Sequence, residues 1–430
     1  MTPTIDTAAG APTATRGVES RRALLVVAFI GFGLLLQSAN YSHLTSFFNV
    51  YALEEKKLSS TQYGIIMGSY NFVMVFVSPL AAKLVSLRLV NDKSLLLAAW
   101  TIDALFCLMM SAVYKLRPGR PFFCGSLIIR ILEASACSIG FVMPYVFSGS
   151  ELNGMSHIMV PVLDTVYGWA VVAGPVMSGL LFDIGGFPLP FWVLGTALLV
   201  WTFLAVCFLP EPRKRRTEAP RSRSLWFVLN FTVIVDVLCT MSVHLLITFN
   251  ESTLAQHLNV KFGYDATQSG LLFFAVGGAH AVTSLISGFL SKKMPDPRYF
   301  VFGGQMVMLA ALVLQGPLIS IKQTEMTLVL AQILLGVGAG PAFGCCYLHA
   351  LRFLSDWGEK KDTHAALAAI FVPAFAISGV IGPIASNIAL DYSSYETTVA
   401  IGALQAAAAT ILLLGTICLG PRSFQKSADV

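Results

Sequence analysis

The segment LPFWVLGTALLVWTFLAVCFL, at residues 189–209, contains no charged side chain over 21 consecutive residues. A helix of about 20 apolar residues is long enough to cross the roughly 30 Å of hydrocarbon in a bilayer. Segments of similar length and character recur before and after it along most of the 430 residues. The sequence therefore predicts an all-α polytopic membrane protein.

The composition of the whole chain supports this prediction. Hydrophobic residues make up 56% of the chain and charged residues 12%, and the mean hydropathy is +0.73, whereas an ordinary soluble domain has about 25% charged residues. This argues against a soluble enzyme. The net charge of +5 comes from bases in the loops between apolar segments, not from one stripe with interleaved aromatics, so no nucleic-acid partner is expected.

Twelve apolar segments are predicted to span the lipid bilayer. Their expected ranges are 23–49, 61–87, 94–114, 122–148, 160–182, 189–209, 224–249, 267–290, 299–320, 326–351, 365–390 and 396–419. Residues 1–20 are rich in Thr, Ala and Pro and lack an apolar period, so a disordered N-terminus is expected. Residues 421–430 form a polar tail.

The distribution of bases predicts the orientation of the chain. The side of the membrane that holds both termini carries 20 Lys and Arg residues, and the opposite side carries 7. The positive-inside rule then places both termini in the cytoplasm. The basic linker PEPRKRRTEAPRSRS, at 210–224, lies on the same side. It is expected to join two six-helix bundles, at 21–209 and 225–420.

An internal repeat also predicts two related halves. TQYGIIMG begins at Thr61 and TQSGLLFF begins at Thr267, an offset of 206 residues. Each segment follows a residue suited to capping a helix N-terminus, Ser59 or Ser60 in one case and Asp265 in the other. The two segments open the second span of each half, as expected for two parallel six-helix repeats.

A Gly-Pro motif repeats with nearly the same offset. Gly174-Pro175 is followed by Asp183, and Gly382-Pro383 is followed by Asp391, each aspartate lying eight residues after the proline. Glycine allows close helix approach and proline permits a bend. The motif residues Gly168, Gly174, Pro175, Gly179, Gly379, Gly382 and Pro383 are therefore candidates for gating, with generic helix packing as the alternative.

One ion pair is predicted inside a span. Arg130 and Glu133 are three residues apart and so share a helix face, and pairing would reduce the cost of about 2.5–3.5 kcal/mol for a charge at the membrane centre. Two hypotheses follow. Protonation of Glu133 could free Arg130 and switch the conformation, or the pair could be purely structural.

Other polar residues inside the spans are candidates for a substrate site. Glu251, near the expected outer end of the seventh span, could supply negative charge to a cation. Asp103 could do the same, but for Asp103 and Asp236 interhelical hydrogen bonding is the favoured alternative. The neutral candidates are Gln37, Asn40, Tyr70 and Asn71, with Tyr41 and His43 beside them. For His244, His280 and His349, packing is favoured over titration.

Three motifs carry a family resemblance. FFNVYALEEKK at 47–57, RILEASA at 130–136 and NESTL at 250–254 resemble the vesicular amine transporter family, and in particular its vesicular polyamine transporter branch. With twelve spans and the repeat, residues 23–420 are similar to the major facilitator superfamily. The Gly-Pro motif likewise resembles the antiporter motif of that superfamily.

This resemblance implies a secondary antiporter that exchanges cationic amines for protons across the membrane of an acidic vesicle. Arg130 and Glu133 would then be the coupling pair, and Glu251 would match the acid of the family's seventh-span motif. Monoamine carriers of the family use aspartates in spans one, ten and eleven, which are absent here at mid-membrane. A polyamine is therefore favoured as substrate, and a plasma-membrane location is the alternative to a vesicle.

Several other functions are weighed against this one. The chain contains no phosphate-binding GxxxxGK[ST] motif and leaves no room for a catalytic domain, so we expect no enzyme activity, cofactor or metal site. Alternatives within transport are a multidrug or other organic-solute exporter. A non-transporting sensor or scaffold would fit the degraded gate motif, of which Lys83 and Arg88 remain. A monomer is expected.

Overall fold

The computed structural model describes residues 13–87, 90–151, 156–211, 230–291, 293–316, 323–355 and 360–419. Every regular element in these ranges is helical. Twelve of the helices are long and apolar enough to cross a membrane, which confirms the predicted number of spans. The predicted tail at 421–430 and most of the linker, residues 212–224, lie outside the described residues.

The N-terminal half, defined as α1 to α7, contains six long helices and four short segments. They are α1 (Thr13–Ser42), η1 (His43–Thr45), α2 (Phe48–Val50), η2 (Tyr51–Glu55), α3 (Ser60–Leu87), α4 (Asp92–Met110), η3 (Val113–Lys115), α5 (Arg120–Glu151), α6 (Ser156–Gly185) and α7 (Pro188–Phe208).

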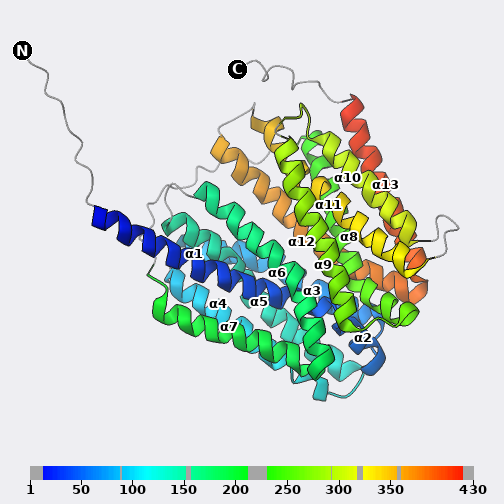
Figure 1. The fold of residues 1–430 in the computed structure, drawn as a ribbon, viewed down its shortest axis with the longest axis horizontal. Helices are drawn as coiled ribbons and strands as arrows, with labels where there is room; N and C mark the ends of the chain where they lie inside the picture. The colour runs from blue at the N-terminus through cyan, green and yellow to red at the C-terminus, as the bar shows by residue number, and fades with distance from the viewer. Residues whose placement is uncertain are drawn as a thin grey trace, which may run out of the picture.

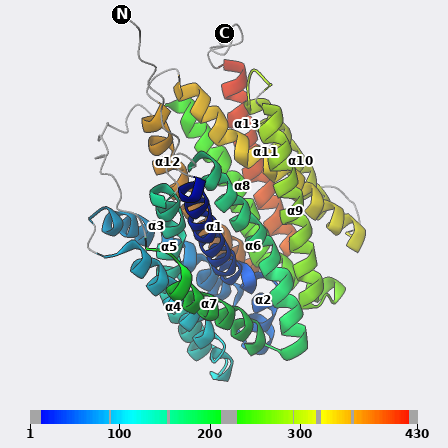
Figure 2. The ribbon, with the colours of Figure 1, turned by 60° about the vertical axis from the view of Figure 1, so that its left-hand side comes forward.

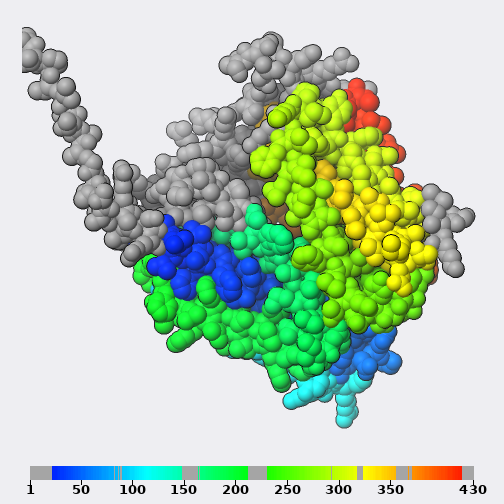
Figure 3. Space-filling view, in the orientation of Figure 1, coloured from blue at the N-terminus to red at the C-terminus, as the bar shows by residue number. Residues whose placement is uncertain are grey.

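The C-terminal half, defined as α8 to α13, contains the other six long helices. They are α8 (Phe231–Phe262), α9 (Ala266–Ser291), α10 (Arg298–Gln315), α11 (Glu325–Ser355), α12 (Lys360–Tyr392) and α13 (Tyr395–Leu419). The two halves occupy different sides of the molecule in the ribbon and space-filling views (Figures 1 and 3).

Each half has its own buried core. Trp100 and Phe147 pack inside the N-terminal half, whereas Leu246, Met308 and Leu335 pack inside the C-terminal half. Another buried cluster, around Phe48 and Phe187, also includes Ala266 of the C-terminal half. The halves meet mainly where α3 packs against α12 and α6 against α9, with a smaller contact between α2 and α8; α6 and α9 are also seen side by side in Figures 1 and 2.

The first span differs from its predicted range at both ends. Helix α1 begins at Thr13, so residues 13–20 are helical and not part of a disordered tail. An apolar run marks only the part of a helix that lies in the membrane, and an existing helix extends readily beyond it. At its other end α1 stops at Ser42, where the chain turns through short segments because Phe47 and Phe48 both pack against Phe187.

The end of the seventh span differs most from its predicted position. Helix α8 continues to Phe262, where Gly263 ends it in the left-handed conformation with φ of 71°. The polar residues after 249 suggested a loop, but they face the protein interior. Asn250, for example, is 2% exposed and donates a hydrogen bond to Gln332 Oε1 at 2.7 Å. Polar residues satisfied inside a bundle do not end a helix.

Candidate functional site

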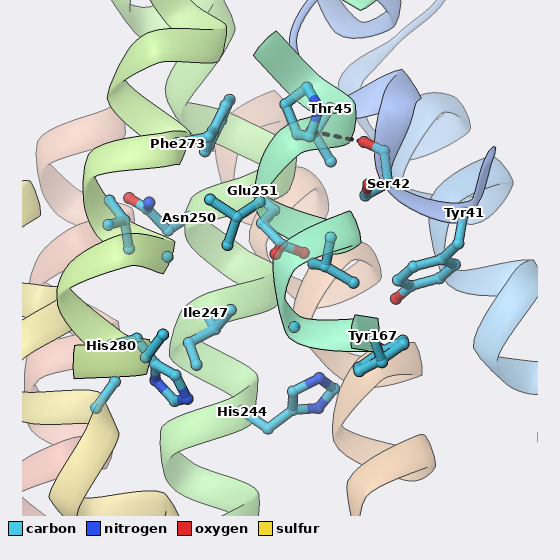
Figure 4. A pocket seen from close by; sticks show the side chains of 18 of the residues that line it. Tyr41, Ser42, Thr45, Tyr167, His244, Ile247, Asn250, Glu251, Phe273 and His280 are labelled. Carbon is cyan, nitrogen blue, oxygen red and sulfur yellow. Dashed lines mark hydrogen bonds between the residues drawn. The ribbon is translucent and has the colours of Figure 1, made fainter. Parts of the chain in front are cut away.

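A cavity of about 210 Å³ lies between the two halves (Figure 4). Its walls come from α1, η1 and α6 of one half and from α8, α9, α11 and α12 of the other. The lining residues are Tyr41, Ser42, Thr45, Tyr167, Gly168, Val171, Val172, Pro175, His244, Ile247, Asn250, Glu251, Phe273, Val276, Gly277, His280, Ala281, Ala339, Phe343 and Phe375. A central cavity shared by two halves is the position expected of a transport site.

Glu251 is the only acidic residue among the described residues of this lining. Glu251 is partly buried, and its carboxylate has no hydrogen-bond or ion-pair partner among the described residues. Figure 4 shows this carboxylate between Tyr41 and Tyr167 on one side and Phe273 on the other. A lone carboxylate among aromatic rings suits an organic cation, which can pair with the charge and contact the ring faces.

Helix α8 brings His244, Ile247 and Glu251 to the cavity because they lie three and seven residues apart on one face. The ring of His244 is held in place by Ser378, whose hydroxyl lies 3.0 Å from Nδ1, and by stacking on Phe375 at 3.6 Å between centroids. Since α8 runs on to Phe262, Glu251 lies well inside a helix and not near its outer end as predicted.

The predicted pair of Arg130 and Glu133 is confirmed. The guanidinium of Arg130 donates a hydrogen bond to Glu133 Oε2 at 2.7 Å, and the two side chains are 1% and 2% exposed. Arg130 also donates to the carbonyl oxygen of Tyr41 at 3.0 Å and lies 4.3 Å from the ring centroid of Tyr70. The charge of Arg130 is therefore held by one acid, one carbonyl and one aromatic face.

A second, small cavity is lined by Arg130 of this pair and by residues that also line the main cavity. Its volume is about 20 Å³, and Arg130, Glu251, Tyr41 and Asn71 are among the residues that line it. A cavity of about 10–15 Å³ is sufficient for one water molecule. Arg130 and Glu251 thus line the same space from opposite halves. The electrostatic interaction between them therefore depends on whether each is paired and charged.

The burial of the ion pair leads to a prediction about stability. Arg130→Ala should lower the free energy of unfolding by about 3–5 kcal/mol, because it leaves the carboxylate of Glu133 buried without its partner. Unfolding of the purified protein by sodium dodecyl sulfate in mixed micelles would measure this loss. Arg130→Lys, which keeps the positive charge, should lose clearly less. A loss below about 1 kcal/mol for the alanine variant would contradict the pairing as a stabilising contact.

Of the other predicted substrate residues, one lines the small cavity and one contacts Arg130. Asn71 lines the small cavity and donates hydrogen bonds to the hydroxyl of Tyr41 at 3.4 Å and to the carbonyl of Gly379 at 3.2 Å. Tyr70 is 1% exposed and lies under the guanidinium of Arg130. Tyr70 is thus placed to support the ion pair, whereas Asn71 bridges the two halves.

Four predicted substrate residues, Gln37, Asn40, Asp103 and the Tyr70 just described, line neither of these two cavities. Gln37 lies inside the N-terminal half, where it accepts a hydrogen bond from Trp100 at 3.1 Å. Asn40 and Asp103 are each 1% exposed. Adjacent helices of the same half cover these polar groups, so a polar residue in a span does not by itself indicate a cavity wall.

The favoured interpretation of Asp236 is confirmed. Its carboxylate lies 2.6 Å from Nδ1 of His349, and this contact joins α8 to α11 inside the C-terminal half. His280, by contrast, lines the central cavity, although packing was the favoured role.

Several cavity residues were not among the predicted substrate candidates. Tyr167 precedes the Gly-Pro motif on α6, and Phe273 and His280 lie seven residues apart on α9. Helical periodicity could have found part of this set, because His244 and Ile247 share the face of Glu251. The aromatic residues of α9, α11 and α12 could not be recognised in this way, because apolar side chains occur both on lipid-facing surfaces and in cavity walls.

The Gly-Pro motifs lie at helix contacts, some of them between the halves. A side chain at Gly179 would begin 2.3 Å from the carbonyl oxygen of Ala266, and one at Gly379 would begin 2.7 Å from Asn71, both across the boundary. The carbonyls of Pro175 and Pro383 similarly face glycines of the opposite half.

The remaining motif glycines differ. Gly174 faces Ser42, and Gly382 faces Thr248, each within its own half. Gly168 has open space where a side chain would begin, so close helix packing does not explain this glycine, which instead widens the cavity that it lines.

Comparison with known proteins identifies similar sequences and folds. The family model described as Major Facilitator Superfamily matches residues 25–345 and again residues 237–428. The chain is 26% identical over 417 residues to the MFS-type transporter SLC18B1 of Rattus norvegicus, covering 91% of this chain and 87% of the relative. It is 24% identical over 412 residues to the Homo sapiens protein of the same name, covering 93% and 88%.

Solved structures show the same architecture. A bacterial homologue of the human lysosomal transporter Spinster aligns with a TM-score of 0.69 at 12% identity, covering 91% of this chain and 95% of that one. The nucleoside transporter NupG aligns with a TM-score of 0.70 at 11% identity, covering 91% and 99%. At these identities the likeness concerns the fold alone.

Proposed function

The chain belongs to the Major Facilitator Superfamily of secondary transporters, and we propose that it exchanges cationic amines, including polyamines, for protons by alternating access. The observation that carries this proposal is the unpaired carboxylate of Glu251 in a cavity between the halves. The similarity to SLC18B1 transporters and the resemblance to vesicular amine transporters support the amine. We place both termini in the cytoplasm and favour a vesicle membrane.

The geometry suggests how proton and amine compete. An ammonium group in the central cavity pairs with Glu251 while Glu133 neutralises Arg130. When Glu133 takes a proton, Arg130 loses its ionic partner. Because Arg130 and Glu251 line the same small cavity, Arg130 is then available to the carboxylate of Glu251. Positive charge beside Glu251 weakens its attraction for the ammonium. Proton uptake thereby promotes release of the amine, as exchange requires.

A second candidate function is export of varied organic cations. Apart from Glu251, the described lining is largely apolar and aromatic, with Phe273, Phe343 and Phe375 among its side chains. Such a surface accepts differently shaped apolar groups beside one fixed charge. Competition by structurally diverse hydrophobic cations, measured beside amines in the assay below, would distinguish this function. Ligand binding without any exchange would instead favour a sensor or scaffold.

Uptake of radiolabelled spermidine tests the proposed function directly. Purified protein in proteoliposomes with an acidic interior should accumulate spermidine above the level reached without a gradient, because outward proton flow drives amine entry. Monoamines serve as the comparison, and protein-free liposomes control for leakage. Absence of accumulation for every amine tested would contradict the amine assignment.

A further inference from the structure

Two aspartates form matching contacts between the halves. Asp183, near the end of α6, accepts a hydrogen bond from the backbone N–H of Thr267 at 2.8 Å and another from the hydroxyl of that residue. Asp391, near the end of α12, accepts from the backbone N–H groups of Ser60 at 2.9 Å and Thr61 at 2.8 Å. Each carboxylate therefore sits on the first turn of a helix from the opposite half.

The start of a helix is a favourable place for a carboxylate. The first backbone N–H groups have no partner within the helix, and the helix dipole places partial positive charge there. Residues of the same half satisfy part of this requirement: Asp265 and Gln268 bond reciprocally at the start of α9, and Ser59 and Gln62 do so before α3. The aspartates from the opposite half supply further acceptors.

The helices are close enough for these bonds because glycine lies beside each contact. Gly179 lets α6 approach the carbonyl of Ala266, and Gly64 lets α3 approach the carbonyl of Pro383, with hypothetical side-chain atoms only 2.3 and 2.5 Å away. Opening the molecule at this end would break four cross-half hydrogen bonds to backbone N–H and hydroxyl groups and expose both helix starts. The aspartates therefore cap α3 and α9 only when the two halves are closed at this end.

We propose that Asp183 and Asp391 form a paired latch that sets how often the molecule opens at the end where α3 and α9 begin. In alternating access this end must open once per cycle, so the latch controls the balance between the two access states. The inference rests on the alternating-access part of the proposed function and requires no particular substrate. If the amine-uptake assay failed, the latch could still be tested by the following experiment, which uses no amine.

The test measures how fast a buried cysteine between the halves reacts with a maleimide. Ser252 is 1% exposed, and its carbonyl accepts a hydrogen bond from Asn49 of the opposite half. The starting protein carries Ser252→Cys, and serine replaces the exposed Cys124, Cys207 and Cys418. When reclosing is faster than labelling, the rate is proportional to the open fraction, whatever its absolute value.

Asp183→Ala and Asp391→Ala should each raise the labelling rate roughly fivefold, the typical effect of removing a helix cap. The double variant should raise it about 25-fold, since distant sites act independently. The corresponding asparagine variants, which keep an acceptor but lose the charge, should give smaller increases. An unchanged or slower rate in both double variants would overturn the latch.

Asp265→Ala is the matched control because it removes a cap from α9 that comes from the same half. It should change the labelling rate by less than about twofold if cross-half bonding is what matters. An increase equal to that of Asp183→Ala would show that stability of the helix start, not the latch, governs opening. Cys137, 0% exposed in the core of the N-terminal half, reports unfolding, and its labelling should stay negligible in every variant.

Discussion

Glu251→Gln is expected to weaken binding of a cationic amine by roughly 10- to 100-fold, because a hydrogen bond to a charged group contributes about 1.5–3 kcal/mol. Glutamine keeps the size of the side chain but removes the only acidic charge from the described lining of the cavity. Equilibrium binding of radiolabelled spermidine to the purified protein would measure the change.

Asp103→Asn provides the matched control for this change. It also neutralises a carboxylate inside a span, but Asp103 is 1% exposed and lines neither cavity. Its affinity for spermidine should therefore remain within about twofold of the parent protein. Equal losses for both variants would mean that Glu251 acts through the general field of the protein and not by direct contact.

Glu133→Gln should abolish gradient-driven accumulation and retain exchange of amine for amine. Glutamine cannot release or bind the coupling proton, so the variant is fixed in a state like that with protonated Glu133. Its affinity for the amine should be lowered, because Arg130 is then available to Glu251, and exchange is therefore measured at a saturating amine concentration. Amine exchange requires only that the loaded protein change its access, and it needs no net proton movement. Uptake with and without a proton gradient, followed by counterflow from preloaded proteoliposomes, would separate the two activities.

Two outcomes would speak against Glu133 as the coupling residue. Accumulation equal to that of the parent protein would remove the need for a proton at this position. Loss of both accumulation and counterflow would point to a structural role, provided that the variant also unfolds more easily. Asp103→Asn again serves as control, since it alters a nearby buried acid outside the cavities.

The sequence predicts the fold well because the bilayer imposes a strict requirement on length and apolarity. All twelve spans were identifiable from apolar runs alone. The pair of Arg130 and Glu133 was also accessible, since two opposite charges three residues apart on a helix have few other partners. These features depend on local spacing, which the sequence contains directly.

The candidate site was harder to predict because its walls come from separate helices of both halves. Gln37 and Asn40 were plausible cavity residues, yet neighbouring helices cover them. The end of α8 was misplaced for a related reason: Asn250 and the residues after it are polar but satisfied inside the bundle. Which side of a helix faces a cavity depends on packing between helices, and the order of residue types within one segment does not specify it.

The caps at the start of α3 and α9 were predictable from the sequence only in part. Ser59 or Ser60 was predicted to cap one helix and Asp265 the other. The hydrogen bonds from the backbone N–H groups of Gln62 and Gln268 identify Ser59 and Asp265 as the capping residues. The repeat also paired Asp183 with Asp391, but equivalence in two copies does not reveal contact. That each aspartate reaches the opposite copy is visible only in three dimensions.

The two aspartates that cap helices of the opposite half, Asp183 and Asp391, can be compared with a symmetric dimer interface. In a dimer of two identical six-helix proteins related by a two-fold axis, one aspartate would make both contacts, because a symmetric interface uses the same surface twice. The present chain has an equivalent arrangement within one polypeptide, so Asp183 and Asp391 can change independently. Asp183 accepts from the backbone N–H and the hydroxyl of Thr267, and Asp391 accepts from the backbone N–H groups of Ser60 and Thr61. Placing both copies in one polypeptide therefore makes two contacts that substitutions can adjust separately.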